Sequence, residues 1–290
     1  MNVCLQVSIR RSAANFIAAA LLAVCVFTYA DTTGTVERMY VFNCGESKTK
    51  DLSVWSPGFN VGKAFEFSDH CYLIKHAQGL ILWDTGMSDS IAAMPDGLVV
   101  GGGMLTLRVP KTLASQLSEM GIAPTAITHL AISHFHSDHC GNANLFTAAT
   151  LYIQEAEYDA AFGENAAKFN YAPANYDKLR ASPMVKLNGD HDVFGDGSVV
   201  IVATPGHTPG HQSLLVRLPK TGVVVLTGDM VHFEENWVNR RIPARNFNKE
   251  QSAQSMEKVA ALLAQTKGQL WINHDKAQSA QVKKAPDYVE

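Results

Sequence analysis

The chain has 290 residues and a formal net charge of −3, from 24 lysines and arginines and 27 aspartates and glutamates. This balance offers no basic face to nucleic acid, and the sequence has no polybasic run and no pattern of interleaved aromatic and basic residues, so nucleic-acid binding is excluded as a function. The length suits one large domain with a sizeable core.

The first thirty residues are typical of a secretory signal peptide. Arg10 and Arg11 precede an uncharged apolar stretch, residues 16–27, and the segment ends at Ala30. The apolar stretch is short for a bilayer span, so we expect no stable membrane anchor, with a retained anchor as the alternative. We predict cleavage after Ala30, a periplasmic or secreted protein, and one catalytic domain over residues 31–290.

Short β-branched segments predict strands over residues 38–43, 71–76, 80–84, 127–133, 150–154, 199–204, 212–218, 223–227 and 269–273. Apolar residues at helical spacing predict helices over 110–120 and 249–265. Strands that alternate with helices favour a layered α/β sandwich. Residues 87–109 have no clear periodicity and are predicted to form a mobile loop or flap.

Three cysteines follow the leader, namely Cys44, Cys71 and Cys140. Cys44 and Cys71 would pair in an oxidising compartment if their strands are neighbours, although two buried reduced cysteines are the favoured interpretation. Cys140 is expected to pack beneath the metal site predicted next.

The segment His134-Phe135-His136-Ser137-Asp138-His139 places four candidate metal ligands directly after an apolar run. In a chain with 11 histidines, this pattern arises by chance in about one such sequence in a thousand. A solvated polar turn after a strand is the alternative interpretation. The pattern therefore predicts a metal site.

Three further candidates, His207, Asp229 and His274, also follow predicted strands. Residues 212–218 and 223–227 predict a hairpin that brings His207 and Asp229 to the same end of a sheet. Seven ligands exceed the need of one tetrahedral zinc, so two ions are predicted. The first ion is assigned to His134, His136 and His207, and the second to Asp138, His139 and His274, with Asp229 as the bridge.

Imidazole and carboxylate ligands without thiolate favour zinc and also suit iron, manganese or cobalt. No organic cofactor is predicted. His211 is expected to support the site without binding metal, whereas Asp84 and Asp275 each either orient a histidine or cap a turn. Four other histidines are expected on the surface or in loops: His70, His76, His129 and His191. Five residues are candidates for an acyl-chain pocket, although core positions are more common: Phe135, Phe146, Phe233, Trp237 and Met104.

These motifs together resemble the metallo-β-lactamase-fold hydrolases over essentially the whole mature chain. The resemblance is carried by the H-x-H-x-D-H segment, residues 204–211, Asp229, His274 and Asp84-Thr85-Gly86. Within that superfamily, the order and loop lengths are most similar to the N-acyl homoserine lactonases. The resemblance implies an αββα four-layer sandwich and a dinuclear metal-dependent hydrolase that opens a small-molecule lactone or ester.

The resemblance also identifies candidate catalytic residues. Lactonases of this group have a tyrosine three residues after the bridging aspartate, and this chain has His232 there. An imidazole can still donate a hydrogen bond to a developing oxyanion, and Asp138 can carry a proton to the leaving oxygen. Asp229 argues against a β-lactamase, because true β-lactamases of this fold usually lack that residue.

Other functions stay open on the sequence alone. One is another hydrolase of this fold, such as a thioesterase or an aryl or phosphoester hydrolase. Another is a mononuclear iron dioxygenase of the same fold, and a third is a metal-binding protein without catalytic activity. A homodimer is also left open.

Overall fold

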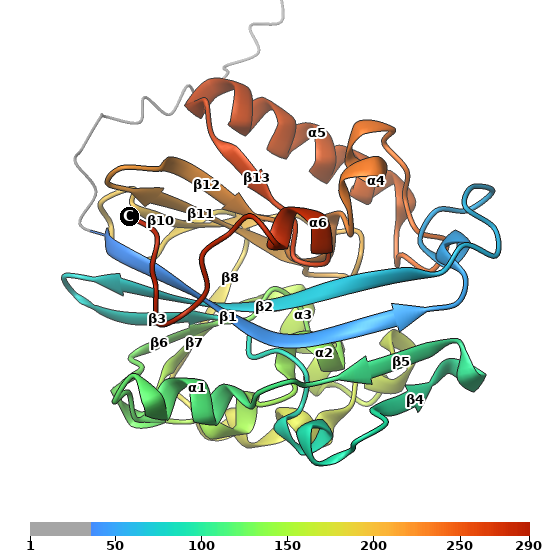
Figure 1. The fold of residues 1–290 in the computed structure, drawn as a ribbon. Coiled ribbons are helices and arrows are strands. Elements are labelled where there is room, and N and C mark those ends of the chain that lie inside the picture. Colours follow the sequence, from blue (N-terminus) through green and yellow to red (C-terminus); the bar gives the residue numbers. More distant parts are fainter. Residues whose placement is uncertain (1–35) are drawn as a thin grey trace, which may run out of the picture. The chain divides into compact units, whose positions relative to one another are not determined.

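Two β-sheets pack face to face and carry helices on their outer faces (Figure 1). The structure is a computed structural model that describes residues 36–290, so the predicted signal peptide lies outside the described residues. Within the described range, no helix is both long and apolar enough to cross a membrane. The two packed sheets with helices on both outer faces confirm the predicted αββα four-layer sandwich.

The larger sheet contains eight strands, which in chain order are β1 Val36–Thr49, β2 Phe65–His76, β3 Gly79–Trp83, β4 Leu98–Val100, β5 Leu105–Arg108, β6 His129–Ala131, β7 Thr150–Gln154 and β8 Met184–Leu187. Their order across the sheet is β4-β5-β1-β2-β3-β6-β7-β8. The pairs from β4 to β3 are antiparallel, whereas β3, β6, β7 and β8 run parallel.

The smaller sheet contains five strands, which are β9 His191–Asp192, β10 Val199–Ala203, β11 Gln212–Leu218, β12 Gly222–Leu226 and β13 Gln269–Trp271. Their order is β13-β12-β11-β10-β9. Strands β11 and β12 pair antiparallel, which confirms the predicted hairpin. Strand β13 pairs parallel with β12, so the chain leaves both strands at the same end of the sheet.

Six α-helices are described, which are α1 Leu113–Glu119, α2 Ser137–Cys140, α3 Glu155–Phe162, α4 Glu234–Val238, α5 Lys249–Thr266 and α6 Lys276–Ser279. Helix α5 begins where the Asn248 side chain accepts a hydrogen bond from the backbone N–H of Gln251, and it ends at Lys267 in the left-handed conformation. It covers the outer face of the smaller sheet, and α1 and α3 lie on the other side of the molecule (Figure 1). Both predicted helices are confirmed.

Three apolar layers result from alternation along the strands. On β2, Cys71 and Leu73 face the helices on the larger sheet, whereas Tyr72 and Ile74 face the smaller sheet. Strands β10 and β12 alternate in the same way between the other sheet and helix α5. Each fully buried aliphatic side chain contributes about 1.5–3 kcal/mol to folding, so these layers fix the strand register that positions the site.

Residues 87–109, predicted to form a mobile loop or flap, contain two short strands. Strands β4 and β5 make a hairpin, and β5 pairs with the end of β1, so that the hairpin extends the larger sheet. Residues 101–103, all glycines with positive φ, make its turn. The prediction failed because strands of three and four residues at a half-exposed edge are too short to show alternation.

His70 and His76 are buried in β2, and the prediction of a surface or loop position was wrong for both. The His76 ring stacks on Phe194 with centroids 3.7 Å apart, and its Nε2 lies 2.9 Å from Oδ2 of Asp196. The Nε2 of His70 lies 2.8 Å from the hydroxyl of Ser279. The residues that cover His70 and His76 are distant from β2 in sequence. The sequence of β2 alone therefore does not reveal that the two side chains are buried.

Cys44 and Cys71 form a disulfide bond between the neighbouring strands β1 and β2. The favoured prediction of two reduced cysteines was therefore wrong. Cys44 is the unpaired residue of a bulge between Asn43 and Gly45, and its Cα lies 5.8 Å from that of Cys71. Gly86 packs against this bond, because a Cβ added there would lie 2.2 Å from the Cβ of Cys44.

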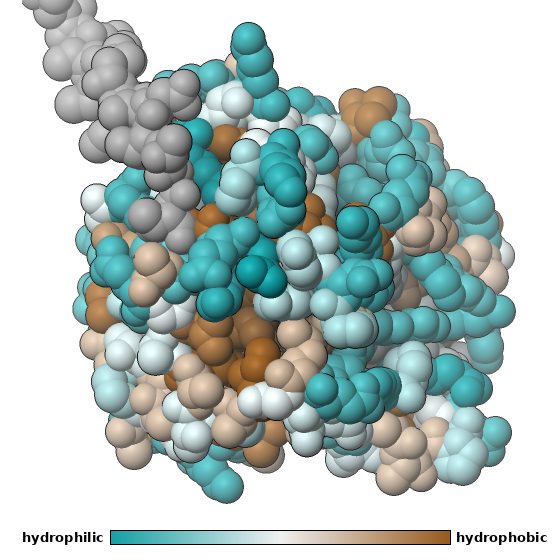
Figure 2. Space-filling model, turned by 60° about the vertical axis from the view of Figure 1, so that its left-hand side comes forward, coloured by the Kyte–Doolittle hydropathy of each residue, from teal (hydrophilic) through white to brown (hydrophobic). Residues whose placement is uncertain are grey.

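The surface is mostly hydrophilic on the face shown in Figure 2, where a hydrophobic patch lies between polar side chains. A cavity of about 910 Å³ is lined by residues of β13 and of the C-terminal segment 281–290, among others. It contains none of the seven predicted metal ligands. The candidate site is therefore located by the chemistry of its side chains and not by the size of a cavity.

Candidate metal centre

Seven side chains from separate segments meet where strands of both sheets end. The loop after β6 and helix α2 supply four of them, and the segments after β10, β12 and β13 supply one each. They are His134, His136, Asp138, His139, His207, Asp229 and His274. The structure thus brings all of the predicted ligands together.

The seven side chains fall into two groups, within each of which the candidate ligand atoms lie within 4.8 Å of one another. Group one contains His134, His136, His207 and Asp229, and group two contains Asp138, His139 and His274. This division agrees with the predicted assignment of ligands to two ions. The binding of ions to the groups stays a prediction.

Asp229 lies between the two groups. Its Oδ1 is 2.9 Å from Nε2 of His274 and 3.0 Å from Nε2 of His139 in group two. Its Oδ2 is 3.4 Å from Nε2 of His207 and 3.8 Å from Nε2 of His134 in group one. One carboxylate therefore presents one oxygen to each group, as a bridging ligand would.

Each of the five histidines has one ring nitrogen turned away from the cluster toward a hydrogen-bond partner. For four of them the partner is an oxygen that only accepts, so the outer nitrogen carries the proton. These bonds are His136 Nε2 to the Phe169 carbonyl at 3.1 Å, His207 Nδ1 to Asn246 Oδ1 at 3.0 Å, His139 Nδ1 to Asp84 Oδ2 at 2.9 Å and His274 Nδ1 to the Ser68 carbonyl at 2.7 Å. His134 Nδ1 lies 3.1 Å from the Ser133 hydroxyl.

In group one, the inner nitrogens of the rings held in this way present lone pairs to one another. His136 Nδ1 lies 2.9 Å from Nε2 of His134 and 3.0 Å from Nε2 of His207. In group two, Nε2 of His139 and Nε2 of His274 are 3.3 Å apart. The converging lone pairs of group one fit a divalent cation, and in group two a second cation would replace the protons that Asp229 draws to His139 and His274.

Electrostatics favour neutral imidazoles in group one. Burial lowers the pKa of His134 and of His207 well below the ordinary value, which suits ligands that bind through a lone pair. Burial also opposes the charge on Asp229, but His274 and His139 outweigh it and hold the pKa of that carboxyl well below its usual range. In return, and against the effect of burial, Asp229 raises the pKa of His139 well above its ordinary value and that of His274 to about 9. Asp229 is therefore an anion that needs positive charge beside it.

Asp84 orients His139, which settles one of the alternatives that the sequence left open. Besides the bond to His139, its Oδ1 accepts a hydrogen bond from the backbone N–H of Ser133 at 2.6 Å, and its Oδ2 accepts one from the Ser133 hydroxyl at 2.9 Å. Asp275 instead caps a helix, because its Oδ1 accepts from the backbone N–H of Gln278 at the start of α6.

His211 belongs to neither group and supports the backbone of the bridging residue. Its Nε2 accepts a hydrogen bond from the N–H of Asp229 at 2.9 Å, and its Nδ1 donates to the carbonyl of Thr204 at 3.0 Å. Both ring nitrogens are thus engaged, and the ring is fully buried. This position agrees with the expected supporting role.

The two candidate catalytic residues both lie beside the cluster. The side chain of Asp138 is 34% exposed, whereas that of His207 is 10% exposed and that of Asp229 6%. The Oδ2 of Asp138 is 3.9 Å from Nε2 of His274. His232 is buried, with Nε2 3.1 Å from Oδ2 of Asp229. Its Nδ1 is buried and has no hydrogen-bond partner among residues 36–290.

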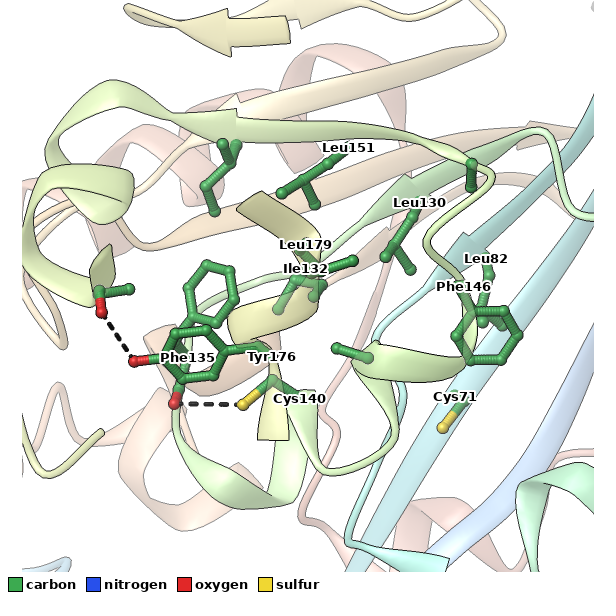
Figure 3. Packing of buried hydrophobic residues seen from close by; sticks show 14 of the residues in the cluster. Cys71, Leu82, Leu130, Ile132, Phe135, Cys140, Phe146, Leu151, Tyr176 and Leu179 are labelled. Atoms are coloured by element: carbon green, nitrogen blue, oxygen red, sulfur yellow. Dashed lines mark hydrogen bonds between the residues drawn. The ribbon is translucent and has the colours of Figure 1, made fainter. Parts of the chain in front are cut away.

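The aromatic candidates for an acyl-chain pocket divide between core and site. Phe135 and Phe146 belong to the core on the outer side of the larger sheet, and Cys140 lies beneath the metal loop with its thiol donating to the Phe135 carbonyl at 3.3 Å (Figure 3). Phe233 is buried beside Phe67, whose ring centroid is 6.2 Å from that of His274. Phe67 and Phe233 thus lie on the group-two side, whereas Trp237 packs against the apolar layer under helix α5 and Met104 is exposed.

Three supporting partners were missed by sequence reasoning. Asn246, which holds His207, follows it by 39 residues, and no local pattern connects the two. The Ser68 and Phe169 partners are backbone carbonyls, which every residue type has. Only the three-dimensional structure identifies them.

Comparison with known proteins agrees with this geometry. Residues 65–266 match the metallo-beta-lactamase superfamily. The chain is 31% identical to the N-acyl homoserine lactonase AttM of Azorhizobium caulinodans over 87% of its length and 98% of that protein. It is also 31% identical to an N-acyl homoserine lactonase of a Bacillus species, over 88% of its length and all of that protein. Among solved structures, an N-acyl homoserine lactone hydrolase with N-hexanoyl-L-homoserine at its catalytic metal centre has a TM-score of 0.76, with 28% identity, 88% of this chain covered and 100% of the other.

Proposed function

Because the chain belongs to the metallo-beta-lactamase superfamily, we propose that it is a metal-dependent hydrolase that opens the lactone ring of N-acyl homoserine lactones. The observation that carries this proposal is the position of Asp229, whose two oxygens face two separate groups of imidazoles. The similarity to lactonases over nearly their whole length supports the choice of substrate class.

The proposed metal content is two divalent ions, with zinc favoured and iron, manganese or cobalt as alternatives. Group one would hold one ion and group two the other, with Asp229 shared between them. Two bound ions would supply an activated water molecule at neutral pH and polarise the lactone carbonyl. The absence of cysteine from both groups supports a borderline ion such as zinc over softer metals.

In the proposed reaction, water adds to the lactone carbonyl carbon, the ring carbon–oxygen bond breaks, and a proton of that water reaches the ring oxygen. Asp138 is the proposed carrier of this proton, because its carboxylate is the accessible one. His232 is the proposed partner of the carbonyl oxygen as negative charge develops there, since its ring lies beside both groups, with centroids 5.3 Å from His207 and 5.7 Å from His274.

We also propose that the protein acts in the periplasm or outside the cell. The sequence of residues 1–30 and the disulfide between Cys44 and Cys71 support an oxidising compartment. Mass spectrometry of the protein from a periplasmic or culture fraction should find a mature chain that begins at Asp31. A full-length chain confined to the cytosol would contradict this part of the proposal.

The substrate proposal is tested by a panel of compounds with the metal-loaded protein and with Asp229→Ala as control. The panel contains N-acyl homoserine lactones of several chain lengths, a thioester, an aryl ester, phosphoesters and a β-lactam. We expect ring opening of the homoserine lactones by the wild-type protein and its loss in the variant. Product formation is followed by chromatography.

Other outcomes would replace parts of the proposal. If the homoserine lactones stay closed while another ester is cleaved, the lactonase assignment falls and the hydrolase assignment stands. One iron per chain together with oxygen uptake would indicate a dioxygenase of the same fold. Two bound ions without turnover of any compound would indicate a metal-binding protein that is not an enzyme.

A further inference from the structure

A buried carboxylate lies behind group one, and neither the metal ligands nor the proposed reaction uses it. Glu157 is in the first turn of α3 and is fully buried, whereas Glu155 in the same turn is exposed. A buried carboxylate is costly unless several hydrogen-bond donors surround it. The donors of Glu157 therefore show what it holds in place.

Four donors surround the two oxygens of Glu157. Its Oε1 accepts from the backbone N–H of Phe135 at 3.1 Å and from the hydroxyl of Tyr171 at 2.5 Å. Its Oε2 accepts from the hydroxyl of Thr208 at 2.8 Å and from the backbone N–H of Gly210 at 2.9 Å. An ionised carboxylate only accepts, so this set of donors suits it and would not suit an amide.

Each donor belongs to a segment that positions one or more histidines of group one. Phe135 is the residue between His134 and His136, and Thr208 directly follows His207. Tyr171 lies two residues after Phe169, whose carbonyl accepts the outer hydrogen bond of His136. One carboxylate thus ties together the three loops that hold the group-one histidines.

The packing around the carboxylate leaves little freedom for these loops. A Cβ added to Gly210 would lie 2.3 Å from the backbone nitrogen of Glu157, so helix α3 and the loop after His207 are in close backbone contact. The ring of Tyr171 also packs edge-on against His136, with centroids 5.6 Å apart. The described contacts of Glu157 include none with a residue of group two.

We propose that Glu157 is a positioning residue that sets the geometry of the group-one ion site, and does so without touching metal or substrate. The inference rests on the proposed function only in that both require group one to bind an ion. Loss of the carboxylate should weaken the binding of the ion in group one and not that in group two, because the histidines of group two are positioned by Asp84 and Ser68.

The test measures zinc binding and not lactone turnover. Metal-free protein is titrated with zinc in competition with a chromophoric chelator, in two backgrounds that each retain one group. His274→Ala retains group one, and His207→Ala retains group two. We expect Glu157→Gln to weaken zinc binding about 10- to 100-fold in the His274→Ala background and to change it less than about twofold in the His207→Ala background.

The matched control is Glu155→Gln, which removes the same charge from the same turn of α3 but from an exposed side chain. It should leave zinc binding unchanged in both backgrounds. If Glu157→Gln does not fold, Tyr171→Phe and Thr208→Val replace it in the test. Each removes one donor to the carboxylate and should weaken zinc binding by group one about three- to tenfold.

A merely structural role for Glu157 would give a different result. In that case the variant would lower the melting temperature of the metal-free protein and leave both zinc affinities unchanged, or would weaken both groups equally, and either result would overturn the inference. Lactone turnover by the wild-type protein together with either result would leave the proposed function standing. A wild-type protein that binds no zinc would overturn both proposals.

Discussion

Asp84 accepts a hydrogen bond from Nδ1 of His139 over 2.9 Å, and it does so from a left-handed backbone conformation with φ of 58°. Aspartate tolerates that conformation better than most side chains. The bond keeps a proton of His139 on Nδ1 and turns Nε2 toward Asp229. The Asp84-Thr85-Gly86 turn is thereby connected to the metal centre.

Replacement of Asp84 by asparagine should loosen group two. Asparagine accepts the left-handed backbone, but its amide nitrogen cannot accept the bonds that Oδ2 receives from Ser133 and His139. We expect the affinity for the group-two ion to fall about 10- to 100-fold. Competition with a chelator measures the change, and Asp177→Asn on the surface is the control. Unchanged affinity in Asp84→Asn would show that the tautomer of His139 is fixed by other contacts.

Replacement of His232 by alanine should slow the chemical step more than it weakens substrate binding. If the imidazole bonds to the developing oxyanion, its removal lowers kcat about a hundredfold, with a smaller change in KM. His232→Tyr, which introduces the tyrosine of the lactonases that the sequence resembles, should keep a donor and retain activity. Steady-state kinetics with a homoserine lactone measures kcat and KM of each variant, with His191→Ala as control. A rise in KM alone would assign His232 to binding and not to catalysis.

His70 should make the protein less stable in mild acid. Burial lowers its pKa to about 3 in the folded protein, against 6.5 for the ordinary side chain. Below pH 6.5 the unfolded chain therefore binds a proton that the folded protein does not, and stability is lost as the pH falls from 6.5 toward 3. We expect this group to remove about 2 kcal/mol of unfolding free energy between about pH 8 and pH 5.

Urea denaturation of the metal-free protein at both pH values measures this effect. His70→Gln keeps a polar side chain beside Ser279 but has no group that titrates at this position. Between about pH 8 and pH 5 the unfolding free energy of the variant should therefore fall by about 2 kcal/mol less than that of the wild type. His191→Gln is the control. Equal losses in wild type and His70→Gln would mean that other groups cause the acid sensitivity.

The disulfide between Cys44 and Cys71 should contribute to stability without being required for the site. The two residues are 27 positions apart, and the closed loop should raise the unfolding free energy by about 3–4 kcal/mol. Denaturation of wild type and of the variant with Cys44→Ala and Cys71→Ala measures the difference. Thiol labelling of the unfolded mature chain should find one free cysteine, Cys140. Three free cysteines would contradict the disulfide.

The metal ligands could be predicted from the sequence because their chemistry depends on residue type and on local position. Each follows a segment with strand character, and the ends of neighbouring strands meet in a layered sandwich whatever the lengths of the loops between them. The six residues from His134 to His139 need no long-range information at all. His207, Asp229 and His274 needed only the expectation that their strands end at one edge.

The supporting contacts could not be predicted, because they join segments that are distant in sequence. Glu157 contacts Gly210 from 53 residues away, and Asn246 contacts His207 from 39 residues away. The β4–β5 hairpin was missed because its strands are short, and the disulfide was missed because it depends on a bulge. Local patterns thus revealed the reacting groups, whereas the contacts that orient them required the folded structure.

The account depends most on Asp229 joining two metal ions in one hydrolytic site. The most direct measurement is zinc per chain together with the rate of ring opening of N-hexanoyl homoserine lactone, in wild type and in Asp229→Ala. We predict two zinc ions and ring opening in the wild type. The variant should hold less zinc and lose more than about a hundredfold in rate, beyond the usual effect of residues that only support a ligand. Undiminished ring opening by Asp229→Ala, or full activity of a wild-type chain that holds one ion, would contradict the account.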